Sequence, residues 1–309
     1  MSSPSRPGSG APDPHLSVIM SERRTLINLA YRLLGSLTEA EDAVQETYAR
    51  WYAMTRQQQE AVEKPGAWLT TVISRICLDM LGSARSRRET YVGAWLPEPL
   101  PGPAEWLNGH PGVGADPADH ITMDESVSMA FLVVLETMTP AERVAFILHD
   151  VFQHSFAEVA EITGRTPATC RKLASLARRR GCASRAPAPP PARQAGLVRD
   201  FKRAWEAADI DALIGILDPG ATVTADGGGL VTAAQRPIEG AEQVARFYAG
   251  IVGIARKVTV LERMVNGQPG LMADLDGVAT VFAFDITGDR IKHIWAVRNP
   301  EKLRPWTAG

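Results

Sequence analysis

Hydrophobic positions in the first part of the chain recur with the spacing of helices. Within residues 15–89, apolar side chains fall three and four positions apart, which is the repeat of a helix with one buried face. The first such stripe consists of Leu26, Leu29, Ala30, Leu33 and Leu34. Gly35 ends it, and Thr38 with Glu41 predicts a capping box that opens the next helix. We therefore expect residues 15–90 to form a helical domain.

Three helix starts lie close together in residues 139–180. Residues 139–142 and 155–158 each place a hydroxyl side chain three positions before a glutamate, the spacing of a capping box. Gly164 can end the second helix in a left-handed conformation, and Thr166 can cap a third helix that begins with proline. The expected apolar seam consists of Val159, Ala160, Ile162, Leu173, Leu176 and Ala177. This pattern predicts a helix-turn-helix domain over residues 126–183.

The third of these helices is basic on its outer side. Five of the ten residues 171–180 are Arg or Lys. The side chains expected to face outward are Thr169, Arg171, Lys172, Ser175 and Arg178. A helix of this size fits the major groove of DNA, with its first residues at base edges and its later cations at phosphates. The alternative interpretation is a generic helical hairpin with a solvated basic end.

The pattern changes after a Pro-rich hinge at residues 184–195. Residues 196–217 have the periodicity of two helices, and from Ala221 onward the apolar positions alternate as in strands. Asn266-Gly267, Asp276-Gly277 and residues 287–289 separate the later strands as tight turns, which predicts a meander. With a further helix near residues 241–251, residues 196–309 are expected to form an α+β cone, in which a curved sheet wraps around helices.

Composition and charge refine this three-domain division. A chain of 309 residues that is 45% apolar can form two or three domains with cores of their own. Residues 91–125 contain six acids and no Lys or Arg, whereas residues 126–193 contain nine Lys or Arg and five acids. The net charge of −2 therefore conceals a basic region that suits nucleic acid.

The composition also argues against a disulfide-rich, metal-binding, secreted or membrane-spanning protein. The three cysteines, Cys77, Cys170 and Cys182, lack paired metal spacing, and their odd number argues against a disulfide framework. A reducing cytoplasm is consistent with this, and we predict no metal or cofactor. Residues 1–14 resemble a disordered tail more than a signal peptide, and no window has the roughly 20 apolar residues that span a bilayer. We expect no membrane partner.

The acidic segment 91–125 is predicted to be a linker. It is rich in Pro and Gly, too polar for a core and too irregular for long helices. Within it, Trp95 and Leu96 are flanked by prolines and form a stiff apolar hook that would seek a docking groove. A plain flexible spacer is the alternative.

Aromatic and basic residues near the end of the first domain suit single-stranded DNA, because rings stack on bases and cations follow the backbone. The candidates are Trp68, Arg85, Arg87 and Arg88. A tryptophan on an apolar stripe is more often part of a core, however.

An enzyme is a further alternative, because cone folds include isomerases and cyclases. Such chemistry needs a carboxylate or histidine base opposite a hydrogen-bond donor in a dry pocket. The candidates are Asp226, His293 and Tyr248. His293 alternates with Ile291 and Trp295 and is expected to share their face, more simply as a structural histidine. Asp226 precedes three glycines, which favours a turn that approaches another segment closely. These residues suggest no catalytic pair.

Segments 29–52, 65–93 and 139–180 together resemble the two conserved domains of bacterial extracytoplasmic-function sigma factors. Three short motifs resemble the signatures of the subfamily with a fused SnoaL-like C-terminal domain. The first is Trp95, Leu96, Pro97, Glu98 and Pro99; the second is Asp226, Gly227, Gly228 and Gly229; the third is Asn299, Pro300, Glu301, Lys302 and Leu303. The subfamily usually continues the second motif with lysine, and this chain has Leu230 instead.

The resemblance implies roles for the residues that match it. Core RNA polymerase would bind at its clamp and flap regions, and the clamp would contact Asp42, Gln45 and Glu46. The helix that contains Trp68 and its basic end would open promoter DNA and capture an unstacked base of the minus-ten element. The minus-thirty-five element would be read by Thr169, Arg171, Lys172 and Ser175, with Arg178 and Arg179 on phosphates. The linker would thread toward the active-site channel of the polymerase.

The three motifs further imply control within one chain. We expect the cone to pack on the DNA-binding domains or their linker through residues 226–229 and 299–303, and so to regulate promoter recognition in cis in place of an anti-sigma protein. Two alternatives are a one-component regulator with a ligand-sensing cone and, less favoured, a SnoaL-like isomerase or cyclase. A small-molecule ligand is possible, but no residue pattern supports one.

Overall fold

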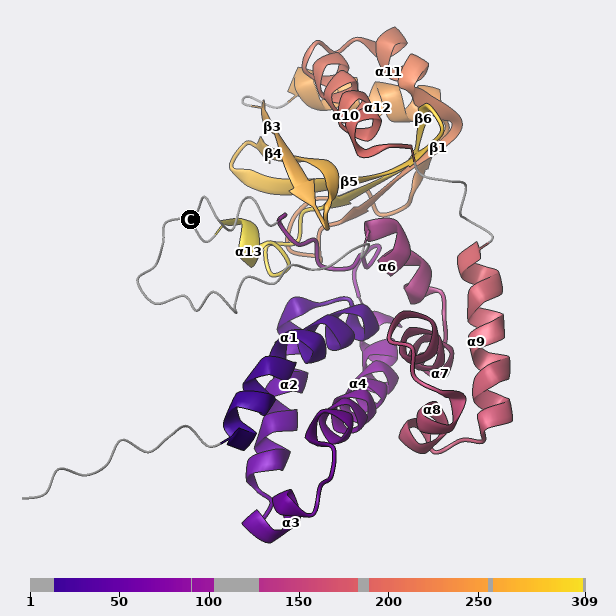
Figure 1. Ribbon diagram of the computed structural model, residues 1–309. Coiled ribbons are helices and arrows are strands. Elements are labelled where there is room, and N and C mark those ends of the chain that lie inside the picture. Colours follow the sequence, from indigo (N-terminus) through magenta and orange to yellow (C-terminus); the bar gives the residue numbers. More distant parts are fainter. Residues whose placement is uncertain (1–13, 90, 103–127, 183–188, 255–257, 308–309) are drawn as a thin grey trace, which may run out of the picture.

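The computed structural model describes residues 14–89, 91–102, 128–182, 189–254 and 258–307. Two helical units lie below a unit built on a β-sheet, and the segment 91–102 runs between them (Figure 1). Residues 1–13 of the tail predicted at 1–14 and most of the predicted linker fall outside the described ranges, and Pro14 is the first residue of the first helix. Among the described helices, none combines the length and the apolar character needed to cross a membrane.

The N-terminal unit is helical, as predicted. Its helices are α1 (Pro14–Leu34), α2 (Leu37–Tyr52), α3 (Arg56–Glu60) and α4 (Pro65–Glu89). The predicted cap at Thr38 is wrong: helix α2 begins earlier, and the Ser36 hydroxyl accepts a hydrogen bond from the Glu39 amide at 3.3 Å. Ser36 and Glu39 have the same capping spacing and directly follow the left-handed Gly35, so the helix starts at the first available cap.

The second unit contains the predicted helix-turn-helix. Its elements are α6 (Met129–Glu136), α7 (Pro140–Phe146), a π-helical turn (Ile147–Val151), α8 (Phe156–Thr163) and α9 (Pro167–Cys182). Both predicted capping boxes are present, and Gly164 ends α8 with a φ of 64°. The seam of α9 differs in part from the prediction. Cys170, Ala174 and Ala177 are buried, while Leu173 and Leu176 are only partly buried. The small side chains let α9 lie close against α7.

The C-terminal unit is the predicted α+β cone. Its elements are α10 (Pro191–Glu206), α11 (Ile210–Ile216), β1 (Leu217–Asp226), β2 (Ile238–Glu239), α12 (Ala241–Ile254), β3 (Val258–Val265), β4 (Gln268–Leu275), β5 (Val278–Thr287), β6 (Arg290–Val297) and α13 (Arg304–Thr307). The strand order is β2-β1-β6-β5-β4-β3, in which only β1 and β6 are parallel. Strands β3 to β6 form the predicted meander. Residues 191–195, predicted as hinge, are the first turn of α10, because proline suits the first position of a helix.

The sheet packs on both faces. Helices α10, α11 and α12 cover one face (Figure 1), where Phe201, Trp205 and Tyr248 meet ring edge to ring face. The opposite face points toward the helical units, and Trp295 and Val297 pack there in a second, smaller core. The cone therefore has one face for its own helices and one for the rest of the chain.

The prediction that His293 shares a face with Ile291 is wrong. Ile286 pairs with Ile291 and Asp285 pairs with His293, so two steps along β6 match one step along β5. This bulge reverses the alternation of side chains. Ile291 belongs to the core under the helices, whereas His293 stacks on Trp295 on the opposite face, with ring centres 5.8 Å apart.

The two helical units share one hydrophobic core. Buried side chains of α1, α2 and α4 form a single cluster with those of α6, α7, α8 and α9. Polar contacts join the units as well: buried Arg143 donates to the Leu33 carbonyl at 2.8 Å, and Arg75 donates to the Glu161 carbonyl at 2.9 Å. In this structure the units behave as one packed body.

Candidate functional site

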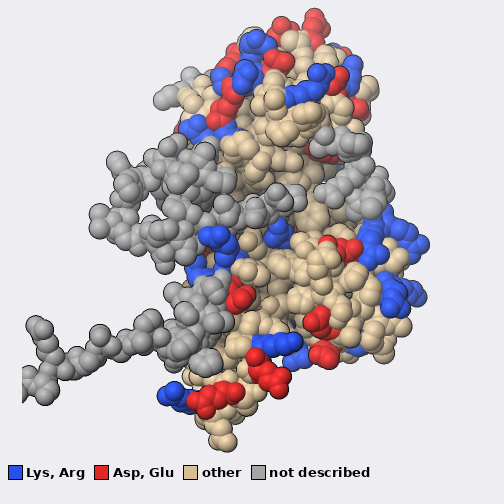
Figure 2. Space-filling model, viewed as in Figure 1, with Lys and Arg blue, Asp and Glu red and all other residues tan. Residues whose placement is uncertain are grey.

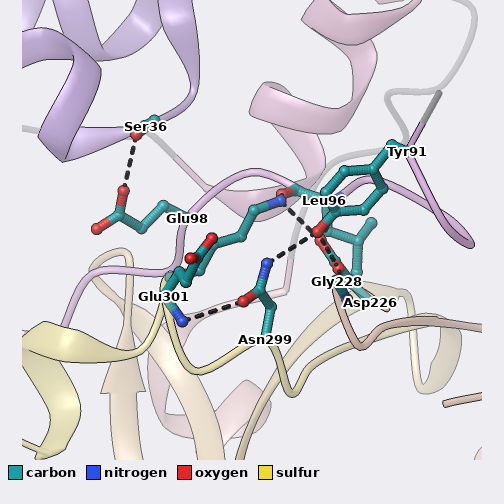
Figure 3. A network of polar contacts seen from close by, with 9 residues as sticks. Ser36, Tyr91, Leu96, Glu98, Asp226, Gly228, Asn299 and Glu301 are labelled. Carbon is teal, nitrogen blue, oxygen red and sulfur yellow. Dashed lines mark hydrogen bonds and ion pairs between the residues drawn. The ribbon is translucent and has the colours of Figure 1, made fainter. Parts of the chain in front are cut away.

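The three sequence motifs meet at a junction between the helical units, the linker and the cone. Figure 3 shows Tyr91, Leu96 and Glu98 of the linker between Ser36 on one side and Asp226 and Asn299 on the other. We call this set of contacts the three-way joint. It is the part of the chain where the cone can act on the helical units.

Asp226, the last residue of β1, is the centre of the joint. Its carboxylate is fully buried and accepts hydrogen bonds from the Tyr91 hydroxyl at 2.6 Å and from the Leu96 amide at 2.9 Å. The Lys302 ammonium lies 2.7 Å from the same carboxylate. A buried charge is stable only when it is paired and hydrogen-bonded, and these three donors meet that condition.

Asn299 connects the third motif to the second motif and to the linker residue Tyr91. Its side-chain amide donates to the Tyr91 hydroxyl at 2.9 Å, and its backbone amide donates to the Asp226 carbonyl at 3.0 Å. Gly228 lies directly against this side chain. A Cβ at Gly228 would come within 2.4 Å of the Asn299 amide nitrogen, and the backbone there has a φ of 64°. The triple glycine therefore allows the close approach that its sequence predicted.

Lys302 provides the cation of the joint. Its ammonium lies 4.1 Å from the centre of the Trp95 ring and 5.2 Å from that of Tyr91, and it donates to the Leu96 carbonyl. Cation–π contact with a desolvated ammonium adds to the ion pair with Asp226. Leu230, where the subfamily has lysine, is 59% exposed. Pro300 and Glu301 are exposed as well, and Leu303 is buried in the core beside the joint.

Glu98 connects the linker to the N-terminal unit. One carboxylate oxygen accepts hydrogen bonds from the Leu37 amide at 2.8 Å and from the Ser36 hydroxyl at 3.0 Å (Figure 3). The carboxylate thus lies at the positive N-terminal end of α2. Burial raises the pKa of Glu98 above its ordinary value, and the hydrogen bonds from α2 oppose this shift.

Tyr31 is a joint residue that the sequence did not reveal. Its buried hydroxyl donates to the Glu98 carbonyl at 2.6 Å and accepts a hydrogen bond from the Asn266 side chain at 2.8 Å. Asn266 also accepts from the Leu100 amide at 3.0 Å. Helix α1, the linker and the cone thus converge on one oxygen atom. Tyr31 lies in an apolar stripe and Asn266 in a turn motif, so neither residue carried a distinguishing signal.

Apolar contacts surround this polar network. Leu96 and Met129 pack with Leu303 in the small core beneath the sheet, and the Trp306 indole donates to the Pro99 carbonyl at 2.8 Å. The linker also pairs with edge strand β3 through the Leu100 carbonyl, which accepts from Asn266, and the Gly102 amide, which donates to Met264. Pro97 and Pro99 are buried, so the linker hook that the sequence predicted is docked here.

The candidate DNA-binding residues of α9 lie on a basic side of the molecule. Figure 2 shows Lys and Arg side chains gathered over α9. Arg171, Lys172 and Arg179 are exposed, and Thr169 and Ser175 are half-buried. The Arg178 Nε lies 2.5 Å from the Asp150 carboxylate and forms an ion pair with it, and Arg180 forms an ion pair with Glu142. Two of the helix's cations therefore already have carboxylate partners.

The candidates in the N-terminal unit lie apart from the joint. The Trp68 ring packs edge to face with the ring of buried Trp51, with ring centres 5.2 Å apart, and Trp68 lies beside the core. Arg85, Arg87 and Arg88 belong to the last turns of α4, where side chains fall outside the described part. The candidate polymerase contacts are exposed along α2; they are Asp42, Gln45 and Glu46.

The three candidate catalytic residues do not converge. Tyr248 is fully buried among the rings under the helices of the cone. Asp226 and His293 lie on the opposite face, where Asp226 is held in the joint and His293 bonds to Thr222 at 2.6 Å. Burial lowers the pKa of His293. The sheet therefore separates Tyr248 from the other two candidates.

Comparison with known proteins agrees with this architecture. Residues 18–87 match the model of Sigma-70 region 2, and residues 128–180 match Sigma-70, region 4. The chain is 37% identical over 295 residues to the ECF RNA polymerase sigma factor SigJ of Mycobacterium tuberculosis, covering 91% of this chain and 90% of that protein. It is 34% identical over 302 residues to the probable ECF RNA polymerase sigma factor SigI of the same species, covering 96% and 97%.

A solved structure extends the similarity to three dimensions. The crystal structure of the Mycobacterium tuberculosis extracytoplasmic function sigma factor SigJ has a TM-score of 0.73 and 33% sequence identity, and the alignment covers 94% of this chain and 98% of that chain. Both helical units and the cone lie within this alignment. The chain belongs to the family of extracytoplasmic function RNA polymerase sigma factors.

Proposed function

We propose that this sigma factor is restrained in cis by its own cone, which holds the two helical units in the closed arrangement through the three-way joint. The observation that carries this proposal is the joint itself. Asp226, Lys302 and Asn299 of the cone bind the linker, and Glu98 of the linker binds helix α2. Separating the units for polymerase and promoter would require these buried contacts to break.

The roles of the remaining site residues follow from the family. The exposed face of α2, with Asp42, Gln45 and Glu46, would bind the clamp of core RNA polymerase, and the second unit would bind its flap. Helix α9 would read the minus-thirty-five element through its outward side chains, and α4 would open the minus-ten element. Because Arg178 and Arg180 are paired with carboxylates, phosphate contacts would first displace Asp150 and Glu142.

Catalysis by the cone has little support from its geometry. Tyr248 and the pair Asp226 and His293 lie on different faces of the sheet. The cone therefore serves as a regulatory domain in our proposal, and the protein acts in the bacterial cytoplasm, where core polymerase is found.

Run-off transcription with core RNA polymerase tests the proposal. Candidate promoters, including the one upstream of its own gene, would be transcribed with the full chain, with a chain ending at residue 193, or with no added protein. Initiation that depends on the added protein is expected. Silence with both forms, together with specific duplex binding, would instead favour a one-component regulator.

Point variants test control by the joint in an intact chain. Asp226→Asn leaves the Lys302 ammonium in place without its buried carboxylate, so the joint should loosen and transcription should rise. Asp276→Asn is the matched control, because Asp276 is an exposed turn residue with a φ of 55° that asparagine readily adopts. Equal transcription from wild type, Asp226→Asn and the truncated chain would contradict cis-regulation.

A further inference from the structure

The chain between helices α7 and α8 is irregular. Residues Ile147–Val151 form a single π-helical turn, and Gln153 has a φ of 59°, which residues other than glycine rarely adopt. Single π-helical turns in helical segments often occur at functional sites. Helix α9 packs against α7 and α8. We call residues 147–156, from the π-helical turn to the first residue of α8, the α8 corner.

The α8 corner holds two cations of helix α9. The guanidinium carbon of Arg171 lies over the Phe156 ring, 5.3 Å from the ring centre. The Nε of Arg178 lies 2.5 Å from the Asp150 carboxylate. Positions seven apart share one face of a helix, so both contacts lie along the same side of α9. The corner therefore sets the directions of two side chains that the sequence assigns to DNA.

His149 supports the ring on which Arg171 lies. The rings of His149 and Phe156 are stacked, with centres 3.8 Å apart and planes inclined by 26°. The Nδ1 of His149 lies 2.7 Å from the carbonyl oxygen of His154. A carbonyl oxygen can only accept, so Nδ1 carries the proton and the imidazole is held in one orientation. Phe156 also packs against the core of the helical units, so its ring is fixed by both neighbours.

A fixed ring gives Arg171 a preferred direction. The Arg171 side chain is exposed, and ordering a long exposed side chain opposes binding. A cation–π contact at an exposed site favours one arrangement by about two- to fivefold. Arg171 lies in the first half of α9, and arginine in that part of a recognition helix can donate two hydrogen bonds to the O6 and N7 atoms of guanine.

We propose that Phe156, backed by His149, is a positioning residue that directs Arg171 toward a guanine of the minus-thirty-five element. Phe156 acts through Arg171 and needs no contact with a base. Asp150 holds Arg178, which is expected at phosphates, so that pair affects affinity without choosing a base. This inference rests on the proposed function, in which α9 reads the minus-thirty-five element.

Selection of promoter DNA by the holoenzyme tests the proposal. Core RNA polymerase with the full chain would capture duplexes from a pool in which the minus-thirty-five positions of an active promoter are randomised. Sequencing the bound DNA gives the base preference at each position. Arg171→Ala should reduce the preference for guanine at one position by about fivefold or more. Phe156→Leu should reduce it at the same position by about two- to fivefold and leave the other positions unchanged.

Two further variants separate positioning from packing. Phe156→Tyr keeps the ring and should retain the guanine preference. Phe152→Leu is the matched control, because the Phe152 ring also lies near a guanidinium, that of Arg32 on α1, at 5.7 Å. It should change no base preference. Preferences are compared between positions of the same bound pool, so a smaller folded fraction affects all positions alike.

The possible failures can be told apart. If Arg171→Ala removes a guanine preference that Phe156→Leu leaves intact, positioning by Phe156 is wrong and base reading by α9 stands. If Arg171→Ala changes no position, Arg171 reads no base, and its role in the proposed function fails together with this inference. An equal loss at every position in Phe156→Leu would show a structural role and would also overturn the inference.

Nuclear magnetic resonance of the full chain measures the direction of Arg171 without DNA or polymerase. A proton above an aromatic ring is shielded, so the Nε–H proton of Arg171 should resonate upfield in the wild type. Its signal is identified by its absence from Arg171→Lys. Phe156→Leu should move this signal downfield, whereas Phe152→Leu should not. An unchanged signal in Phe156→Leu would mean that the ring does not hold the guanidinium in solution, and the proposal would be wrong.

Discussion

Individual polar side chains decide how the three parts of this molecule are joined. Asp226, Glu98 and Tyr31 are all buried, and each makes hydrogen bonds to segments far away in the sequence. Because a buried polar group is costly when its partner is lost, such residues make a contact specific as well as strong. The joint is therefore sensitive to changes of a single atom.

Tyr31→Phe should destabilise the chain by about 1–3 kcal/mol. The change removes one hydroxyl and leaves the Glu98 carbonyl and the Asn266 amide without that partner. The free energy of unfolding in urea measures the loss. Tyr52→Phe is the control, because Tyr52 is 55% exposed and should shift stability by less than about 0.5 kcal/mol. A loss as small as that of the control would mean that the hydroxyl contributes nothing to the joint.

Glu98 should make stability depend on pH. Burial raises its folded-state pKa above the ordinary value of 4.5, so between these two values the folded chain holds a proton that the unfolded chain has lost. The stability that the folded state gains from binding this proton is fully present below pH 4.5 and is lost as the pH rises through the folded-state pKa of Glu98. Glu98→Gln does not titrate. The unfolding free energy of Glu98→Gln minus that of wild type should therefore increase above pH 4.5 and then level off.

Subtracting the two profiles isolates Glu98 from other titrating groups. Burial also raises the pKa of Asp285, whereas hydrogen bonds to Ser155 lower the pKa of Glu158, and both contributions cancel in the difference. Urea titrations at several pH values between 4 and 8 would supply the profiles. A difference that does not change with pH would contradict the raised pKa.

At the level of elements, short loops and irregularities create the contact surfaces. The loop after β1 brings Gly228 against Asn299, and the bulge in β6 turns His293 toward the helical units. Helix α2 begins at Leu37 with Ser36 as its cap, which lets the Leu37 amide donate a hydrogen bond to Glu98. Each of these features changes the direction of a side chain or the proximity of a backbone without changing the fold.

Gly228→Ala should be considerably more harmful than Gly288→Ala. Both glycines have positive φ, 64° and 59°, so either substitution strains the backbone by about 1–2 kcal/mol. Apart from its chain neighbours, no atom of the described residues lies within 4 Å of a Cβ at Gly288, whereas one at Gly228 would meet Asn299 at 2.4 Å. Overpacking should add about 1–3 kcal/mol at Gly228. Urea unfolding of both variants checks this, and equal losses would show that Asn299 moves aside freely.

At the scale of the whole molecule, two kinds of contact hold the three units together in this structure. The helical units share a hydrophobic core, and the cone binds the linker that connects them. When only a small fraction of a protein is in the conformation that can bind, its apparent affinity for the partner is the intrinsic affinity multiplied by that fraction. Contacts present only in the closed state should therefore oppose polymerase binding.

Arg75→Ala should strengthen binding to core RNA polymerase by about fivefold or more, because the two hydrogen bonds that it removes together contribute about 1 kcal/mol or more. Arg75 of α4 donates to the carbonyls of Ile162 and Glu161 at the end of α8, and each hydrogen bond stabilises by about 0.5–1.5 kcal/mol. Fluorescence anisotropy with labelled protein would measure the affinity. Arg56→Ala is the control, since Arg56 pairs only locally with Glu60 on α3. Weaker binding by Arg75→Ala would mean that Arg75 serves the complex and not the closed state.

Much of the architecture could be predicted from the sequence because its signals are local. The capping boxes at Thr139 and Ser155, the left-handed Gly164 and the turns at Asn266 and Asp276 appear where the pattern placed them. Caps and tight turns depend on the chemistry of a few adjacent residues, so neighbours in sequence suffice to determine them. The cap of α2 differs from the prediction because two hydroxyl residues with capping spacing, Ser36 and Thr38, lie two positions apart.

The sequence by itself determined the order of the elements, the helix-turn-helix and the family, all of which depend on short-range periodicity and motif spacing. Only the tertiary structure decided that Tyr31 and Asn266 meet, that Lys302 pairs with Asp226, and that His293 faces away from the helices of the cone. These contacts join residues far apart along the chain or depend on a one-residue bulge. Their geometry arises from the packing of whole elements, which no local pattern encodes.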